Sequence, residues 1–229
     1  MGAFSIWKGN TIMKERFRLL RAEFRNTLSF LGDIVILNLL FLICSIPIFT
    51  IGASATACYA GVSRTLQKKE TGLVYRAFFQ DFKASFRQAT ACWLIELAAI
   101  LILLGDLWFA VEYSEPDNVF FIIFAAIVGA GMLLASLWLY PLIARFRNTL
   151  GGHLKNAVLL AFARFPRTIL ALVIWVVTLG LPLTIYEVYA YLGWLWLASG
   201  ISLPMYWTVK LFRKTLALDQ SQEELSLED

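Results

Sequence analysis

Residues 45–62 read SIPIFTIGASATACYAGV, and this stretch decides how many times the chain is predicted to cross a membrane. Pro47 and Gly52 are residue types typical of a turn. The residues after Gly52 are nearly all small, and small residues allow helix backbones to approach one another closely inside a membrane bundle. The stretch therefore predicts a helical hairpin whose second helix, over residues 53–62, is short or re-entrant and packs among neighbouring helices instead of facing lipid.

The composition around this stretch indicates a membrane protein. The chain has 229 residues, of which 59% are hydrophobic and 16% charged, and its mean hydropathy is +0.70. Soluble domains are about 45–50% apolar and about 25% charged. Disordered chains have low hydropathy and high net charge. These numbers exclude a disordered chain and a soluble enzyme with one core, and they predict an all-α, polytopic helical membrane protein.

Five stretches of the chain are long enough to cross a bilayer as helices. A spanning helix needs about 20 mostly apolar residues, because the hydrocarbon layer is about 30 Å thick and a helix rises 1.5 Å per residue. Spanning β-strands are shorter and alternate in polarity, so the length of these runs predicts helices. The stretches run over residues 28–48, 89–111, 119–143, 168–188 and 192–211.

The positions of the basic residues predict the number of crossings. All twenty lysines and arginines fall in residues 1–29, 60–88, 144–167 and 210–229, while the connections near Glu115 and Glu187 have none. Short cytoplasmic loops are enriched in basic residues. With residues 53–62 as a sixth membrane helix, every basic residue and both termini lie in the cytoplasm; five spans is the alternative. The chain then divides into a basic N-terminal segment (1–27), a transmembrane domain (28–212) and an acidic tail (213–229).

Two cytoplasmic segments are predicted to form amphipathic surface helices. Over residues 74–89, aromatic side chains recur every three or four positions, which places them on one helix face. Residues 145–167 interleave apolar and basic side chains in a similar way. Such helices either anchor the chain to anionic lipid or provide a docking surface for a partner protein. The candidate lipid-docking or partner-docking residues are Phe78, Phe79, Phe82, Phe86, Arg87, Phe146 and Arg147.

Four polar residues fall inside the predicted spans, where an ionisable group is costly and therefore a candidate for function. Glu96 is the deepest carboxylate, predicted to take part in structural pairing or, alternatively, in proton or substrate transport. Asp33 lies about one turn into the first span and Asp106 lies near the outer end of its span. Asn38 adds an amide within the first span.

The sequence contains no recognisable motif for catalysis or cofactor binding. The sequence has no phosphate-binding GxxxxGK[ST] loop, no HExxH zinc pair and no GxSxG nucleophile elbow. One histidine, His153, and three separated cysteines do not form a metal-binding pattern. We therefore expect no enzyme activity, no cofactor and no metal. The basic segments flank membrane spans, so they predict membrane lipid as a partner and not nucleic acid.

Several segments resemble the YesL family of bacterial integral membrane proteins. They are residues 33–40, 44–54 (CSIPIFTIGAS), 78–90, 140–146 (YPLIARF) and 165–168 (FPRT), and the likeness extends from about residue 28 to 215. The resemblance implies the bacterial cytoplasmic membrane and supplies no catalytic residues. Members of that family are commonly encoded near carbohydrate ABC importers. The resemblance therefore implies an accessory role beside importer permease subunits; the alternatives are a stand-alone secondary carrier and a membrane sensor or scaffold.

Overall fold

The computed structural model describes residues 21, 24, 27–67, 73–112, 118–184, 193–194 and 196–216. These residues form helices joined by turns, and no strand occurs among them, which confirms the predicted all-α class. The predicted basic segment, acidic tail and turn near Glu187 lie largely or entirely outside the described residues.

The helical hairpin predicted from residues 45–62 is present. The first helix, Thr27–Cys44, is followed by the short 3-10 helix η1 (Ile48–Thr50) and by α2 (Ile51–Leu66). The Thr50 hydroxyl lies 2.6 Å from the carbonyl oxygens of both Cys44 and Pro47. The Thr50 side chain therefore stabilises the turn that begins at Pro47.

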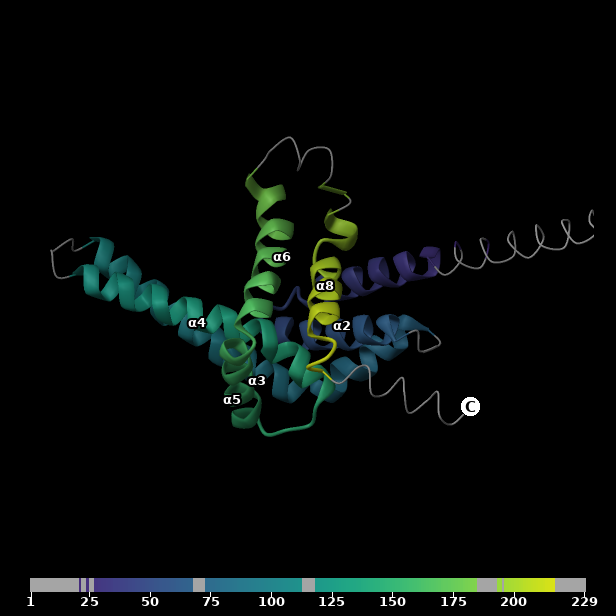
Figure 1. Ribbon diagram of the computed structural model, residues 1–229, viewed down its shortest axis with the longest axis horizontal. Helices are drawn as coiled ribbons and strands as arrows, with labels where there is room; N and C mark the ends of the chain where they lie inside the picture. The colour runs from purple at the N-terminus through teal and green to yellow at the C-terminus, as the bar shows by residue number, and fades with distance from the viewer. Residues whose placement is uncertain are drawn as a thin grey trace, which may run out of the picture.

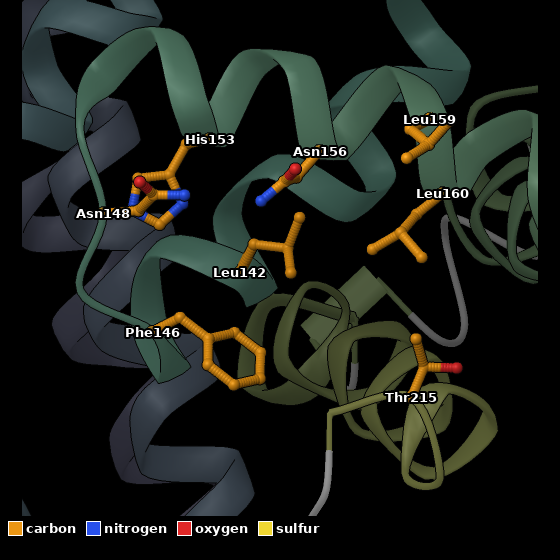
Figure 2. Close-up of a pocket in the computed structure, with 8 residues that line it drawn as sticks. All are labelled: Leu142, Phe146, Asn148, His153, Asn156, Leu159, Leu160 and Thr215. Carbon is orange, nitrogen blue, oxygen red and sulfur yellow. The ribbon is translucent and has the colours of Figure 1, made fainter.

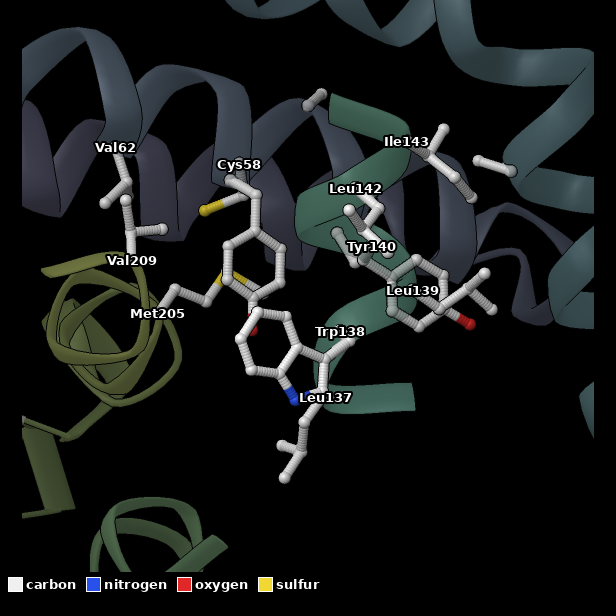
Figure 3. Close-up of a cluster of buried hydrophobic side chains, with 14 of the residues drawn as sticks. Cys58, Val62, Leu137, Trp138, Leu139, Tyr140, Leu142, Ile143, Met205 and Val209 are labelled. Atoms are coloured by element: carbon white, nitrogen blue, oxygen red, sulfur yellow. The ribbon is translucent and has the colours of Figure 1, made fainter. Parts of the chain in front are cut away.

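Helix α2 occupies the centre of the molecule. Most of its residues are buried, as predicted from their small size, and it packs against α3 (Val74–Glu112), α4 (Asn118–Arg145) and α8 (Ser202–Phe212). Figure 3 shows Cys58 and Val62 of α2 facing Met205 and Val209 of α8, with the buried side chains of α4 beside them. At 16 residues, α2 is about 24 Å long, which is short for a complete crossing.

The first predicted surface helix is not a separate element. Residues 74–89 and the following apolar span form one continuous helix, α3, of 39 residues. No proline or glycine occurs between residues 74 and 104, so nothing in the backbone chemistry interrupts the helix where its polarity changes. The structure therefore corrects the predicted boundary near residue 89.

The second predicted surface helix is also divided differently. Residues 146–149 are not helical, and α5 (Leu150–Ala163) begins after them, with Thr149 as its N-cap. Helix α6 (Phe165–Thr184) then follows at an angle of 98° to α5. The interpretation of residues 145–167 as one helix is therefore wrong, although α5 forms its central part.

In the part of the chain that the structure describes, three helices are long and apolar enough to cross a membrane: Thr27–Cys44, Val74–Ala110 and Phe121–Arg145. The bent pair of α5 and α6 would make a fourth if it counts as one span. In Figure 1 the α3–α4 hairpin and the first helix extend to opposite sides of the central helices, while α6 is steeply inclined to α4 and α8 to α2. This arrangement differs from a parallel bundle, and the six crossings stay a prediction.

Candidate functional site

Glu96 is held between α3 and α4 by two hydroxyl groups. Its side chain is only 8% exposed. The Ser136 hydroxyl donates to one carboxyl oxygen at 2.7 Å, and the Tyr140 hydroxyl donates to the other at 2.5 Å. Ser136 and Tyr140 are four residues apart, so they lie on the same face of α4, one turn from each other. The two helices are thus joined at a position where the described part of the chain buries a carboxylate.

The partners of Glu96 seen among the described residues are hydroxyl groups and not basic side chains. The ion pair seen among the described residues joins Arg64 and Asp81. Asp81 precedes Glu96 by 15 residues in α3, which corresponds to about 22 Å along the helix. Both carboxyl oxygens of Glu96 accept hydrogen bonds from groups of the same protein, and the choice between structural pairing and transport stays a prediction.

Asn38 bridges a break in the helical segment before α8. Its amide nitrogen donates to the Leu197 carbonyl at 2.7 Å, and its carbonyl oxygen accepts from the backbone nitrogens of Ile201 and Ser202, each at 3.0 Å. These are the orphan groups that a helix end leaves without partners. The α8 N-cap residue makes no capping bond with its own side chain. Asn38 therefore supplies the cap from the first helix.

The other two predicted intramembrane residues do not join either contact. Asp33 is half-buried on the first helix, and Asp106 is exposed in the last part of α3. Glu96 contacts α4, whereas Asn38 contacts residues 197–202. The four candidates thus belong to separate places, and within the described residues no group of three His, Cys, Asp or Glu side chains could hold a metal ion.

The predicted docking residues of α3 divide between the core and the surface. Phe78 is fully buried in the main core cluster, so its assignment as a docking residue is wrong. Phe79 and Phe86 are about two-fifths exposed, Phe82 is half-buried, and Arg87 is exposed. Because residues three or four apart share a helix face, the sequence pattern did not separate the side facing α2 from the side facing outward.

The segment between α4 and α5 places the other two docking candidates beside α3. Phe146 and Arg147 are exposed in the non-helical stretch 146–149. The Gln88 side chain donates to the Asn148 carbonyl at 2.6 Å. The positions next to Arg87 and Arg147 are therefore in direct contact, which joins the two segments that the sequence marked as docking surfaces.

A pocket that the sequence pattern did not predict lies between the end of α4, α5 and Thr215. Its volume is about 320 Å³, and Figure 2 shows its lining residues, which are Leu142, Phe146, Asn148, His153, Asn156, Leu159, Leu160 and Thr215. His153 is 1% exposed, and its Nε2 atom has no hydrogen-bond partner among the described residues. Burial lowers the pKa of His153, so the imidazole is neutral near pH 7.

Residues 34–107 match a protein family described as "protein of unknown function, DUF624". This is a family of membrane-associated proteins. The matched range contains the central hairpin, most of α3, and both Asn38 and Glu96. No curated protein and no solved structure matches the chain.

Proposed function

We propose that this chain is a noncatalytic integral membrane protein that crosses the bacterial cytoplasmic membrane six times with both termini in the cytoplasm. The apolar helices of the described chain and the match to a membrane-associated family support this proposal. Large apolar side chains are also exposed along the far ends of α3 and α4, including Leu101, Trp108 and Ile127. Lipid is the environment in which such exposure carries no cost.

Within the membrane, the protein acts as an accessory factor and not as a carrier. The observation that carries this proposal is that the deepest carboxylate and the amide of the first span are both bonded inside the protein. Glu96 accepts from Ser136 and Tyr140, and Asn38 caps α8. A carrier needs polar groups that can exchange their partners with substrate or protons. In this protein the Glu96 carboxylate and the Asn38 amide instead join helices to one another by hydrogen bonds.

The partner is the permease part of an ABC-type carbohydrate importer. The resemblance of residues 44–54, 78–90 and 140–146 to the YesL family supports this assignment. The exposed side of α3, with Phe79, Phe86 and Arg87, offers aromatic and basic groups of the kind enriched in protein interfaces. A sensor or scaffold that binds another cytoplasmic regulator would use the same surface.

Copurification tests the accessory role. The full chain is expressed with the permease subunits of a carbohydrate importer, extracted in mild detergent and captured by a tag. We expect the permease to copurify with the wild-type chain and to be lost from a Phe79→Ala/Arg87→Ala variant. Leu101→Ala is the matched control, because Leu101 is exposed on the same helix but lies in its apolar half. Isolation of the wild-type chain without permease would contradict the assignment.

Transport assays separate the accessory role from the carrier. The purified chain is reconstituted in proteoliposomes, and proton-coupled sugar flux is compared between wild type and Glu96→Gln. We expect no flux above empty vesicles for either protein. Flux that is present in wild type and abolished by Glu96→Gln, with folding unchanged, would establish the carrier and overturn the accessory role.

A further inference from the structure

We propose that the pocket between α4, α5 and Thr215 binds the phosphate-containing headgroup of an anionic phospholipid, with an acyl chain lying over the exposed face of α5. This inference is independent of any importer partner. It rests on the hydrogen-bonding groups in the pocket, the charge around it and the apolar wall on one side.

The hydrogen-bonding groups lie together at one part of the pocket. Figure 2 draws His153 and Asn148 in the same part of the view with the Asn156 amide turned toward them, and all three residues line the pocket. Leaving the Nε2 atom of His153 buried without a partner costs free energy. A bound ligand that completes this hydrogen bond removes that cost, and the two amides can donate to the same ligand.

Thr215 adds a further donor on the other side of the pocket. Its hydroxyl oxygen accepts a hydrogen bond from the Arg167 guanidinium at 3.3 Å. Among the described residues the Thr215 hydroxyl is seen only as an acceptor, so its hydrogen can donate to a ligand, and the Arg167 guanidinium lies within hydrogen-bond distance of its oxygen. Such a combination of neutral donors and a nearby arginine suits a phosphate group.

The charge on the α4–α5 side of the pocket favours an anion. Residues 145–167 contain five basic side chains, and no Asp or Glu occurs between residues 118 and 186. Arg147 and Lys155 are exposed and are sequence neighbours of the pocket residues Asn148 and Asn156. Basic groups beside a membrane attract anionic lipids.

The apolar wall favours a lipid over a soluble phosphate. Leu159 lines the pocket and yet is 61% exposed, so the pocket is continuous with the outer face of α5. Phe162 and Val158 extend this apolar face, and both are exposed. A soluble phosphate compound would leave these side chains in water, whereas an acyl chain would cover them.

Native mass spectrometry of the full chain tests the site. The protein is delipidated in detergent and titrated with phosphatidylglycerol or, for comparison, phosphatidylcholine. We expect bound phosphatidylglycerol on the wild type, and an affinity reduced about tenfold by Asn156→Leu with Thr215→Val, since each lost hydrogen bond weakens binding several-fold. Leu101→Ala, on the far part of α3, is the control and should bind as wild type.

Three outcomes would overturn the proposal. The first is equal binding of phosphatidylglycerol to wild type and to the double variant while both remain folded by circular dichroism. The second is equal binding of phosphatidylglycerol and phosphatidylcholine. The third is displacement of phosphatidylglycerol by stoichiometric glycerol phosphate, because the pocket would then bind a soluble phosphate compound without using the apolar wall.

Discussion

The side-chain oxygen of Asn38 lies 3.0 Å from the backbone nitrogen of Ser202, although 164 residues separate them in the chain. The Ser202 hydroxyl in turn donates to the Ile34 carbonyl at 2.9 Å. The first helix and α8 are therefore joined by hydrogen bonds in both directions. In an apolar environment a broken helix is tolerated only where another part of the protein completes its backbone hydrogen bonds.

Replacing Asn38 by alanine should destabilise the protein. The substitution leaves the Leu197 carbonyl and the amides of Ile201 and Ser202 without their partner. We expect a loss of about 1–3 kcal/mol in the free energy of unfolding, because unsatisfied buried polar groups are costly. Leu39→Ala, at the neighbouring exposed position, is the control and should lose less. Unfolding in detergent micelles measures both variants, and equal losses would contradict the capping role.

The contact between Glu96 and Tyr140 should appear as a coupling free energy. In a double-mutant cycle of Glu96→Leu and Tyr140→Phe, we expect a coupling of about 0.5–3 kcal/mol, since residues in one hydrogen-bond network are not additive. The Tyr75→Phe substitution provides the control cycle, because Tyr75 lies 21 residues before Glu96 in α3 and is exposed. That cycle should be additive within about 0.5 kcal/mol. Additivity at Tyr140 would show that the hydrogen bond contributes nothing to stability.

The hairpin could be predicted from the sequence because its signals are local. Pro47, Gly52 and the small residues after them act within a few positions of one another. The hydrogen-bond partners of the Asn38 side chain could not be predicted, since they lie about 160 residues away and are backbone groups. A buried amide indicates only that some partner must exist.

The candidate surface residues show why helix periodicity alone is insufficient. Phe78, Phe82 and Phe86 form a series of neighbouring rings along α3, with centroid distances of 6.3 and 5.5 Å between consecutive pairs. Yet Phe78 is in the core and Phe86 is partly exposed, because α2 covers only part of α3. Similarly, His153 has no sequence pattern around it, and its pocket exists only because α4, α5 and Thr215 meet.

Two glycines should respond in opposite ways to substitution by alanine. A Cβ atom at Gly52 would lie 2.5 Å from the Ala89 carbonyl oxygen, a backbone atom that cannot move aside cheaply. We expect Gly52→Ala to destabilise the protein by about 1–3 kcal/mol, as overpacking does.

Gly105, also in a helix, has no atom within 4 Å of such a Cβ. Gly105→Ala should be neutral or stabilising by up to about 1 kcal/mol. Thermal unfolding of both variants tests this, and a tolerated Gly52→Ala would contradict the close packing of α2 against α3.

The stability of the protein should contain a pH-dependent contribution from His153. Burial lowers the pKa of this histidine from its ordinary value of 6.5. As the pH falls below 6.5, the unfolded chain takes up a proton at His153 that the folded protein resists, so protonation favours unfolding. Above this range the imidazole is neutral in both states and the contribution is constant. We expect the free energy of unfolding of wild type to fall more steeply between pH 7 and pH 5 than that of His153→Gln, which cannot titrate at this position.

The comparison is made by denaturant unfolding in the same detergent at each pH, with His153→Gln carrying every other titratable group of the wild type. Identical slopes for the two proteins would show that the imidazole is hydrated in the folded state, and the pocket would then lack its buried, unpartnered nitrogen.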